Sequence, residues 1–319
     1  MEKARKLRKS LENNEILRIV GAHNGIGAKL IEKNGFDGVW ASGLEISTSY
    51  ALPDASILTM TEFLNATKVI NNATSLPVIA DCDTGYGNVL NVIHMVKEYE
   101  TAGIAAVCIE DKKFPKVNSF VPGRQELAPA EEFVDKIRAA KDTQQTEDFM
   151  LFARVEALIA GWSMEEALKR ARMYADAGAD GIFIHSKSKT PQEIVDFVEQ
   201  WDRETPLIIC PTKYPSLTFD EIRMLGKVQV VIYANHGVRA QIRAMNEVLS
   251  KIHTYGTTFS VEEDIATIEE VFEIQGMPRF KDAEKQYIRK SDSLSRINIT
   301  VRELDKIWNS KSVKMRIEG

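Results

Sequence analysis

The sequence predicts an α/β protein with the architecture of a (β/α)8 TIM barrel and extra C-terminal helices. The first observation is a periodicity. Between residues 16 and 256, a short β-rich apolar run alternates eight times with a longer segment of helical period. The second observation is that nearly all of the short runs are apolar on both faces, as buried parallel strands are. Because a doubly wound open sheet produces a similar periodicity, it remains the alternative architecture.

The predicted strands and helices follow one another in regular order. The segments between the strands place apolar residues at spacings of three and four, as in 164–175 and 194–201, so each helix has one face to pack on a sheet. Glycines within 34–40, 102–110 and 177–185 stand between a helix and the next strand, where glycine suits a helix C-cap. The eight predicted strands are Leu17–Ala22, Gly38–Ala41, Pro77–Ala80, Ala105–Ile109, Met150–Val155, Gly181–Ile184, Leu207–Cys210 and Val230–Ala234.

The C-terminal part of the chain departs from this alternation. Beyond Gly256, residues 261–276 and 280–290 have the pattern of extra helices. Residues 291–319 are polar and charged, with no strong period. We therefore expect one barrel domain over residues 1–290 and a polar tail over 291–319, to which the sequence assigns no role.

Composition and charge narrow the class of protein. Of the 319 residues, 44% are hydrophobic and 27% are charged, which excludes disordered and collagen-like chains. The 41 Lys and Arg against 46 Asp and Glu leave a formal charge of −5, so we expect no nucleic-acid partner. No apolar run could span a membrane, and the charged first 15 residues lack a secretory apolar region. The expectation is a cytoplasmic protein with no membrane partner.

Three cysteines, Cys82, Cys108 and Cys210, lie in separate apolar segments without CxxC spacing. Their odd number and their spacing argue against a disulfide framework and against a zinc site. We interpret them as small hydrophobic core residues.

Polar residues follow every predicted strand. In a barrel, the residues at the carboxyl ends of the strands form one rim, and active sites are built there. Taken one at a time, each of these residues is also a common turn or cap residue. The full set is His23, Asn24, Ser42, Asp81, Asp83, Glu110, Asp111, Arg154, Glu156, His185, Thr212, Lys213, Asn235 and His236.

Three acidic residues of this rim predict a metal site. Asp81 and Asp83 follow the third strand two residues apart, and Glu110 follows the fourth. Carboxylate oxygens together with waters suit a hard divalent cation, so we predict a Mg²⁺ centre on Asp81 with help from Asp83 and Glu110. The alternative is that these are surface acids or helix caps.

A long connection follows the fourth strand. Residues 112–129, KKFPKVNSFVPGRQELAP, carry four cationic side chains, Asn118 and Ser119. Long loops of this kind are commonly functional lids. Cations beside an acidic metal site suggest an anion held between the metal and Lys or Arg, as phosphoryl chemistry requires. A solvated basic loop is the alternative.

At these residues the sequence resembles the phosphoenolpyruvate mutase family of the isocitrate lyase superfamily. The resemblance covers residues 10 to 290 in collinear order. It implies a barrel whose C-terminal helix is swapped between subunits, a homotetramer built as a dimer of dimers, and Mg²⁺-dependent interconversion of phosphoenolpyruvate and phosphonopyruvate. The motifs that carry the resemblance are AHNG (22–25), WASGLEIS (40–47), DCDTGYGN (81–88), EDKKFPKVNS (110–119), ARVEALIAGW (153–162) and HSK (185–187).

The resemblance also implies a role for individual residues of this chain. Asp81 would be the direct magnesium ligand, with Asp54, Asp83 and Glu110 reaching the ion through waters. A second group, from the loop and the rim, would hold the migrating phosphoryl group: Lys116, Asn118, Arg154 and His185. A third group would bind the rest of the small-molecule substrate: Trp40, Ser42, Gly43, Leu44 and Ser119.

Related activities remain as alternatives. Superfamily carbon–carbon lyases use a cysteine in the loop, and KKFPKVN at 112–118 contains none, which disfavours a lyase. In the phosphonopyruvate hydrolases the loop Asn is typically Thr, so Asn118 favours a mutase, with a hydrolase as the runner-up. A barrel that only binds an anion would be expected to lack some of Asp81, Lys116 and Arg154, and all three are present.

Overall fold

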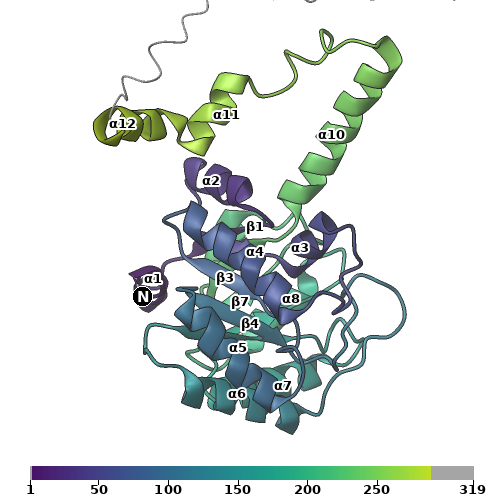
Figure 1. Cartoon of the computed structure of the whole chain (residues 1–319). Coiled ribbons are helices and arrows are strands. Elements are labelled where there is room, and N and C mark those ends of the chain that lie inside the picture. Colours follow the sequence, from purple (N-terminus) through teal and green to yellow (C-terminus); the bar gives the residue numbers. More distant parts are fainter. Residues whose placement is uncertain (1, 289–319) are drawn as a thin grey trace, which may run out of the picture. The chain divides into compact units, whose positions relative to one another are not determined.

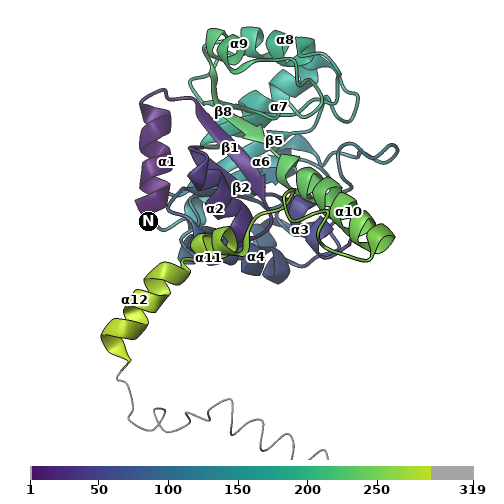
Figure 2. The same cartoon turned by 90° about the horizontal axis from the view of Figure 1, so that it is seen from above.

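The computed structural model describes residues 2–288, and the predicted tail 291–319 lies outside this range. Eight parallel strands form a closed barrel in chain order, with β1 hydrogen-bonded to both β2 and β8 (Figures 1 and 2). This pairing confirms the predicted barrel and excludes the open sheet. The strands are β1 (Leu17–Ala22), β2 (Gly38–Ala41), β3 (Val78–Asp81), β4 (Ala106–Glu110), β5 (Met150–Val155), β6 (Gly181–Ile184), β7 (Leu207–Ile209) and β8 (Val228–Tyr233).

The helices between the strands cover the outside of the barrel. The apolar faces of α2 and of α4 to α9 pack on outward-facing side chains of the strands in two core clusters. The helices are α1 (Glu2–Glu12), α2 (Gly25–Lys33), α3 (Gly43–Ser49), α4 (Met60–Ala73), α5 (Val89–Thr101), α6 (Ala130–Thr143), α7 (Met164–Asp176), α8 (Gln192–Gln200), α9 (Phe219–Met224), α10 (His236–Tyr255), α11 (Ile268–Gln275) and α12 (Met277–Tyr287).

A second core cluster fills the inside of the barrel. Inward-facing side chains of the strands, among them Phe152 and Phe183, are buried there together with Leu7 and Leu11 of α1. Since α1 precedes β1, its apolar face packs at the amino ends of the strands. The carboxyl ends are left free to form a site, as in other barrels of this kind.

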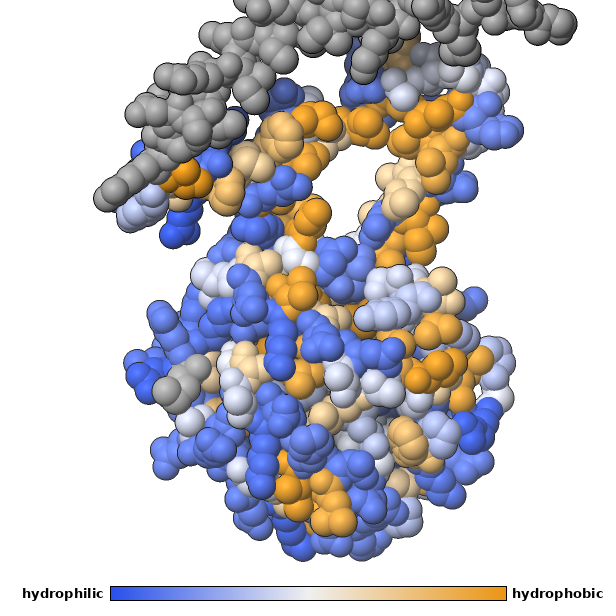
Figure 3. Space-filling view, in the orientation of Figure 1, coloured by the Kyte–Doolittle hydropathy of each residue, from blue (hydrophilic) through white to orange (hydrophobic). Residues whose placement is uncertain are grey.

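The helix α10 differs from the helices that cover the barrel, because only Val238 of its 20 residues is buried. Ile242, Met245 and Leu249 recur at spacings of three and four on one face, and each is more than half exposed. Figure 3 shows apolar side chains along this helix.

The chain divides into two compact units, Met1–Val261 and Glu262–Gly319. The sequence analysis placed α11 and α12 with the barrel in one domain, and that assignment stays a prediction. The predicted helix over 261–276 is shorter than expected. It begins only at Ile268, because Thr267 caps it by accepting a hydrogen bond from the Glu270 N–H. Within residues 2–288, no helix is both long and apolar enough to cross a membrane.

Candidate active site

A pocket opens at the carboxyl ends of the strands, where the sequence predicts the site. Ten of the thirteen predicted site residues line it, and the other three, Gly43, Asp83 and Glu110, each contact a residue that lines it. The lining consists of Trp40, Ser42, Leu44, Asp54, Asp81, Lys116, Asn118, Ser119, Phe120, Arg154, Phe183, His185, Cys210, Thr212, Ile232, Ala234 and Asn235.

The start of α3 forms one wall of the pocket. Ser42 caps this helix by accepting a hydrogen bond from the Glu45 N–H at 3.3 Å. The Gly43 N–H donates to Asp81 Oδ2 at 3.2 Å. A Cβ at position 43 would lie 3.0 Å from the same oxygen, so glycine permits this close approach. The helix start is therefore tied to the predicted metal ligand.

The predicted metal ligands are buried acids. Burial raises the pKa of Asp81, although Lys116 and Arg154 oppose the shift. Burial also raises the pKa of Asp83, to about 7, against the opposing charge of Lys116 and with the support of neighbouring carboxylates. Asp83 Oδ1 and Glu110 Oε1 are buried without a hydrogen-bond partner. Buried acids of this kind need positive charge close by.

The ammonium of Lys116 supplies part of that charge. Its Nζ lies 2.5 Å from Asp54 Oδ1 and 3.1 Å from Asp83 Oδ1. The Asn118 amide donates to the other oxygen of Asp54, Oδ2, at 2.6 Å. Although burial opposes the charge of Asp54, Lys116 and Asn118 hold its pKa below the usual value. The loop thus reaches the acidic wall of the pocket through two side chains.

The donor set fits a hard divalent cation such as Mg²⁺, because it is made of carboxylate oxygens and two of these accept no hydrogen bond. In the part of the chain that the structure describes, no three His, Cys, Asp or Glu side chains form a group that could hold an ion. The Lys116 ammonium stands among them instead. The assignment of Asp81, Asp83 and Glu110 as metal ligands stays a prediction.

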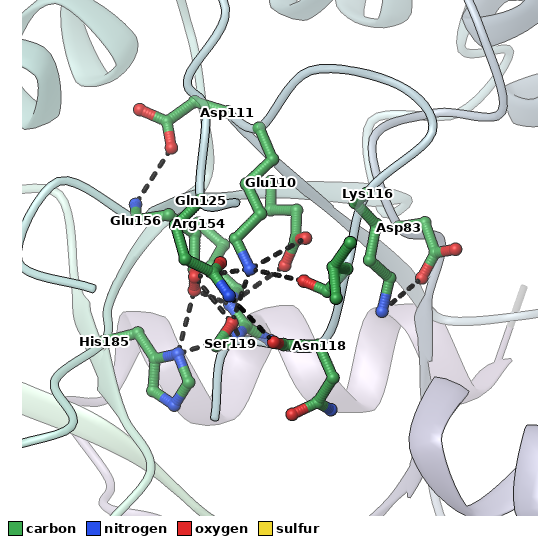
Figure 4. A network of polar contacts seen from close by, with 12 residues as sticks. Asp83, Glu110, Asp111, Lys116, Asn118, Ser119, Gln125, Arg154, Glu156 and His185 are labelled. Atoms are coloured by element: carbon green, nitrogen blue, oxygen red, sulfur yellow. Dashed lines mark hydrogen bonds and ion pairs between the residues drawn. The ribbon is translucent and has the colours of Figure 1, made fainter. Parts of the chain in front are cut away.

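The opposite wall is a buried network around Glu156 (Figure 4). Its Oε1 accepts from Arg154 Nε at 2.5 Å, and its Oε2 accepts from Ser119 Oγ at 2.6 Å. Lys112 Nζ lies 3.1 Å from the same Oε2. Although burial opposes its charge, Arg154, His185 and Lys112 hold the pKa of Glu156 well below the usual value. This carboxylate therefore stays ionised and orients the donors around it.

The Nδ1 atom of His185 lies between two charged groups. Arg154 Nη2 lies 2.7 Å and Glu156 Oε1 lies 2.8 Å from that nitrogen. Burial and the charge of Arg154 lower the pKa of His185, so the ring is neutral near pH 7. Nδ1 thus faces a guanidinium, which can only donate, and a carboxylate, which can only accept, so each tautomer of the neutral ring satisfies one of these two neighbours.

Sequence reasoning missed the roles of three residues. The sequence predicts Glu156 only as a polar residue after a strand, because its position at the centre of the network depends on partners from other segments. Phe120 lines the pocket, and its ring lies 5.3 Å from the ring of His185. Ser56 bonds both Asp83 and Lys116, and no sequence pattern signals it.

Other residues of the predicted rim have partners away from the pocket. Asp111 pairs with Arg170, and His23 pairs with Glu45.

Comparisons with known proteins agree with this geometry. A sequence model of the family described as phosphoenolpyruvate phosphomutase matches residues 7–253. The chain belongs to this enzyme family. It is 45% identical over 287 residues to a phosphoenolpyruvate phosphomutase of Tetrahymena pyriformis, covering 90% of this chain and 95% of that one. It is also 45% identical over 290 residues to the phosphonopyruvate hydrolase of Variovorax sp. (strain Pal2), covering 91% of this chain and all of that one.

Solved structures of the family share the fold. The phosphoenolpyruvate phosphomutase of Streptomyces platensis subsp. rosaceus superposes with a TM-score of 0.88 at 52% identity, covering 90% of this chain and 99% of that one. A phosphonopyruvate hydrolase in complex with oxalate and Mg²⁺ superposes with a TM-score of 0.86 at 44% identity, covering 91% of this chain and all of that one. Members of this family therefore include both a mutase and a hydrolase.

Proposed function

We propose that this chain is a phosphoenolpyruvate mutase, a Mg²⁺-dependent isomerase that interconverts phosphoenolpyruvate and 3-phosphonopyruvate and so starts phosphonate biosynthesis. The observation that carries the proposal is the position of Asn118. Its amide lines the pocket and donates to Asp54 at 2.6 Å. Hydrolases of the family typically have Thr at the corresponding loop position, and the amide is the longer side chain, which occupies more of the space beside the phosphorus.

The reaction moves a phosphoryl group within one molecule. The bond between phosphorus and the enol oxygen breaks, and a bond between phosphorus and C3 forms. The negative charge on the migrating phosphoryl group is stabilised by hydrogen-bond donors and cations that are already in position before the reaction. Arg154 and His185 stand on one side of the pocket, and Lys116 and Asn118 reach it from the loop. Trp40, Ser42, Gly43, Leu44 and Ser119 would hold the pyruvyl part.

The carboxylates would hold the ion. Asp81 would ligate Mg²⁺ directly, and Asp54, Asp83 and Glu110 would reach it through waters. When bound, the ion polarises the enolate oxygen. The oxygens of Asp83 and Glu110 that accept no hydrogen bond support this assignment. The hydrolase complex with oxalate and Mg²⁺ is consistent with a divalent metal site in the family.

A phosphonopyruvate hydrolase is the second candidate, because the two relatives are equally similar to this chain at 45% identity. The difference lies in the acceptor of the phosphoryl group, which is water in the hydrolase and the enolate in the mutase. A superfamily carbon–carbon lyase is disfavoured, because no cysteine occurs in the loop 112–129. A barrel that only binds an anion would not need the complete set of donors.

The deciding experiment is ³¹P NMR of phosphonopyruvate incubated with the protein and Mg²⁺. We expect the phosphoenolpyruvate signal to appear. Free phosphate as the main product would instead assign the hydrolase. An unchanged spectrum would exclude both activities and leave the anion-binding barrel.

The apolar face of α10 supports the proposed assembly. Ile242, Met245 and Leu249 are exposed on it, and Ile26 and Leu30 of α2 are exposed on the barrel. We propose that a second copy of the chain covers this face through helix swapping, and that two such dimers form a cytoplasmic homotetramer. Light scattering with size-exclusion chromatography tests this. Ile242→Asp together with Leu249→Asp should yield smaller species, and an unchanged mass would contradict the swap.

A further inference from the structure

The loop 112–129 is fastened to the short segment around Asp54 by both backbone and side chains. The Asn118 N–H donates to the Asp54 carbonyl oxygen at 3.0 Å. The Lys116 N–H donates to Ser56 Oγ at 3.2 Å. The segment around Asp54 therefore binds the backbone N–H groups of Lys116 and Asn118, the two loop residues whose side chains reach the pocket.

Ser56 differs from the other contacts, because it does not line the pocket. Its hydroxyl donates to Asp83 Oδ2 at 3.1 Å while it accepts from the Lys116 N–H. One hydroxyl group therefore connects the acid that follows β3 to the backbone of the loop. A hydroxyl can donate and accept at once, and an alanine side chain can do neither.

The backbone at Ser56 is held in an uncommon conformation. Its φ is +54°, in the left-handed region that residues other than glycine seldom adopt. Asp83, its partner, has a φ of +50°. Such conformations persist where the surrounding contacts determine them, and they cluster at ligand clamps and switch regions. The conformation of both residues is consistent with a hydroxyl held in one place.

We propose that Ser56 is a positioning residue that holds the loop closed over the pocket and thereby keeps water away from the phosphorus. This inference rests on the proposed function and deepens it, because it names what keeps Lys116 and Asn118 in place during the transfer. If the loop opens, water attacks the phosphorus, the carbon–phosphorus bond breaks, and the enolate carbon takes a proton. The products are then pyruvate and phosphate.

The perturbation is Ser56→Ala, which removes both hydrogen bonds of the hydroxyl. Ser56→Gly removes the same hydroxyl but tolerates the positive φ, so the pair separates the hydroxyl from the backbone conformation. Ser49→Ala is the matched control, because Ser49 is an exposed residue whose hydroxyl bonds only to the Ile46 carbonyl oxygen of its own helix. Thermal melting checks that each variant folds.

Two readouts test the proposal. The first is hydrogen exchange of residues 112–129, which reports loop opening whatever the reaction is. The second is the ratio of phosphoenolpyruvate to phosphate formed from phosphonopyruvate, measured by ³¹P NMR. We expect both Ser56 variants to speed loop exchange about 2- to 10-fold, the range for losing one neutral hydrogen bond, and to raise the share of phosphate. Ser49→Ala should match the wild type in both.

Each outcome counts for or against the role of Ser56. Wild-type exchange in Ser56→Ala overturns it, and so does an effect of Ser56→Ala that Ser56→Gly does not share. A lower rate with unchanged exchange and product ratio would indicate support of the fold alone, and overturns it too. If the wild type makes only phosphate, the mutase proposal fails and acceptor selection fails with it, while faster loop exchange in both variants still supports loop holding by Ser56.

Discussion

Replacing Asn118 with alanine is the sharpest test of the proposed transfer. In the structure its Nδ2 donates to Asp54 Oδ2 at 2.6 Å, and its Oδ1 accepts from the Phe120 N–H at 3.0 Å. Hydrogen bonds to charged groups contribute about 1.5–3 kcal/mol, which corresponds to about 10- to 150-fold. Removing a donor to a developing charge typically costs about 10² to 10³ in kcat. The two ranges overlap near 10², so we expect a loss of about 100-fold in the mutase rate.

Asn118→Thr should act differently. Threonine is shorter and β-branched, so it opens space beside the phosphorus and approaches the hydrolase pattern. We expect the remaining activity to shift toward pyruvate and phosphate. Lys116→Ala should slow both outcomes, because its charge stabilises the phosphoryl group whichever acceptor takes it.

The assay is ³¹P NMR of phosphonopyruvate with saturating Mg²⁺, which yields both the rate and the product ratio. Val121→Ala is a control on the same loop, because Val121 is 48% exposed and does not line the pocket. Two results would refute the reasoning. One is a wild type that already yields mainly phosphate, and the other is an Asn118→Thr variant with unchanged rate and ratio.

Three further predictions concern the ion, the thiols and pH. Chelation should abolish turnover, Mg²⁺ or Mn²⁺ should restore it, and Asp81→Ala should not be rescued; full activity in excess chelator would contradict this. Replacing Cys82, Cys108 and Cys210 by Ser or Ala should leave the chemical step intact in any variant that folds, although Cys210 lines the pocket. Lost packing of about 1–3 kcal/mol would lower the melting temperature. A folded but inactive variant would reopen the lyase hypothesis. The pKa of Asp83 is raised from 3.8 to about 7, so between these pH values the folded ion-free protein holds a proton that the unfolded chain has released. The melting temperature of the ion-free protein should therefore fall as pH rises from about 4 to 7. Excess Mg²⁺ should reverse that fall.

The positions of the strands could be predicted from the sequence. Leu17–Ala22, Gly38–Ala41, Met150–Val155 and Gly181–Ile184 agree with the structure residue for residue. These runs are mostly apolar and are each followed by a polar residue, so local composition determines where each begins and ends. The same pattern places polar side chains after every strand, and Ser42, Asp81, Arg154 and His185 of that rim line one pocket. The other predicted residues that line it came from the loop 112–129 and from the family resemblance.

Closure of the barrel depended on the tertiary structure. The periodicity of an open sheet is the same, and only the pairing of β1 with β8, more than 200 residues apart in the chain, excludes it. The start of α11 also differs from the prediction, because the capping box of Thr267 and Glu270 begins the helix inside the predicted range.

The contacts inside the site were decided in the same way. Glu156 meets Ser119 across 37 residues of chain, and Ser56 meets Lys116 across 60. Neither pair has a local signal, because a buried hydrogen bond depends on where the backbone brings two groups and not on the residues beside them. The sequence by itself therefore determined which groups stand on the rim. The tertiary structure decided which of them are paired, because a buried charge must find its partner within a few ångströms.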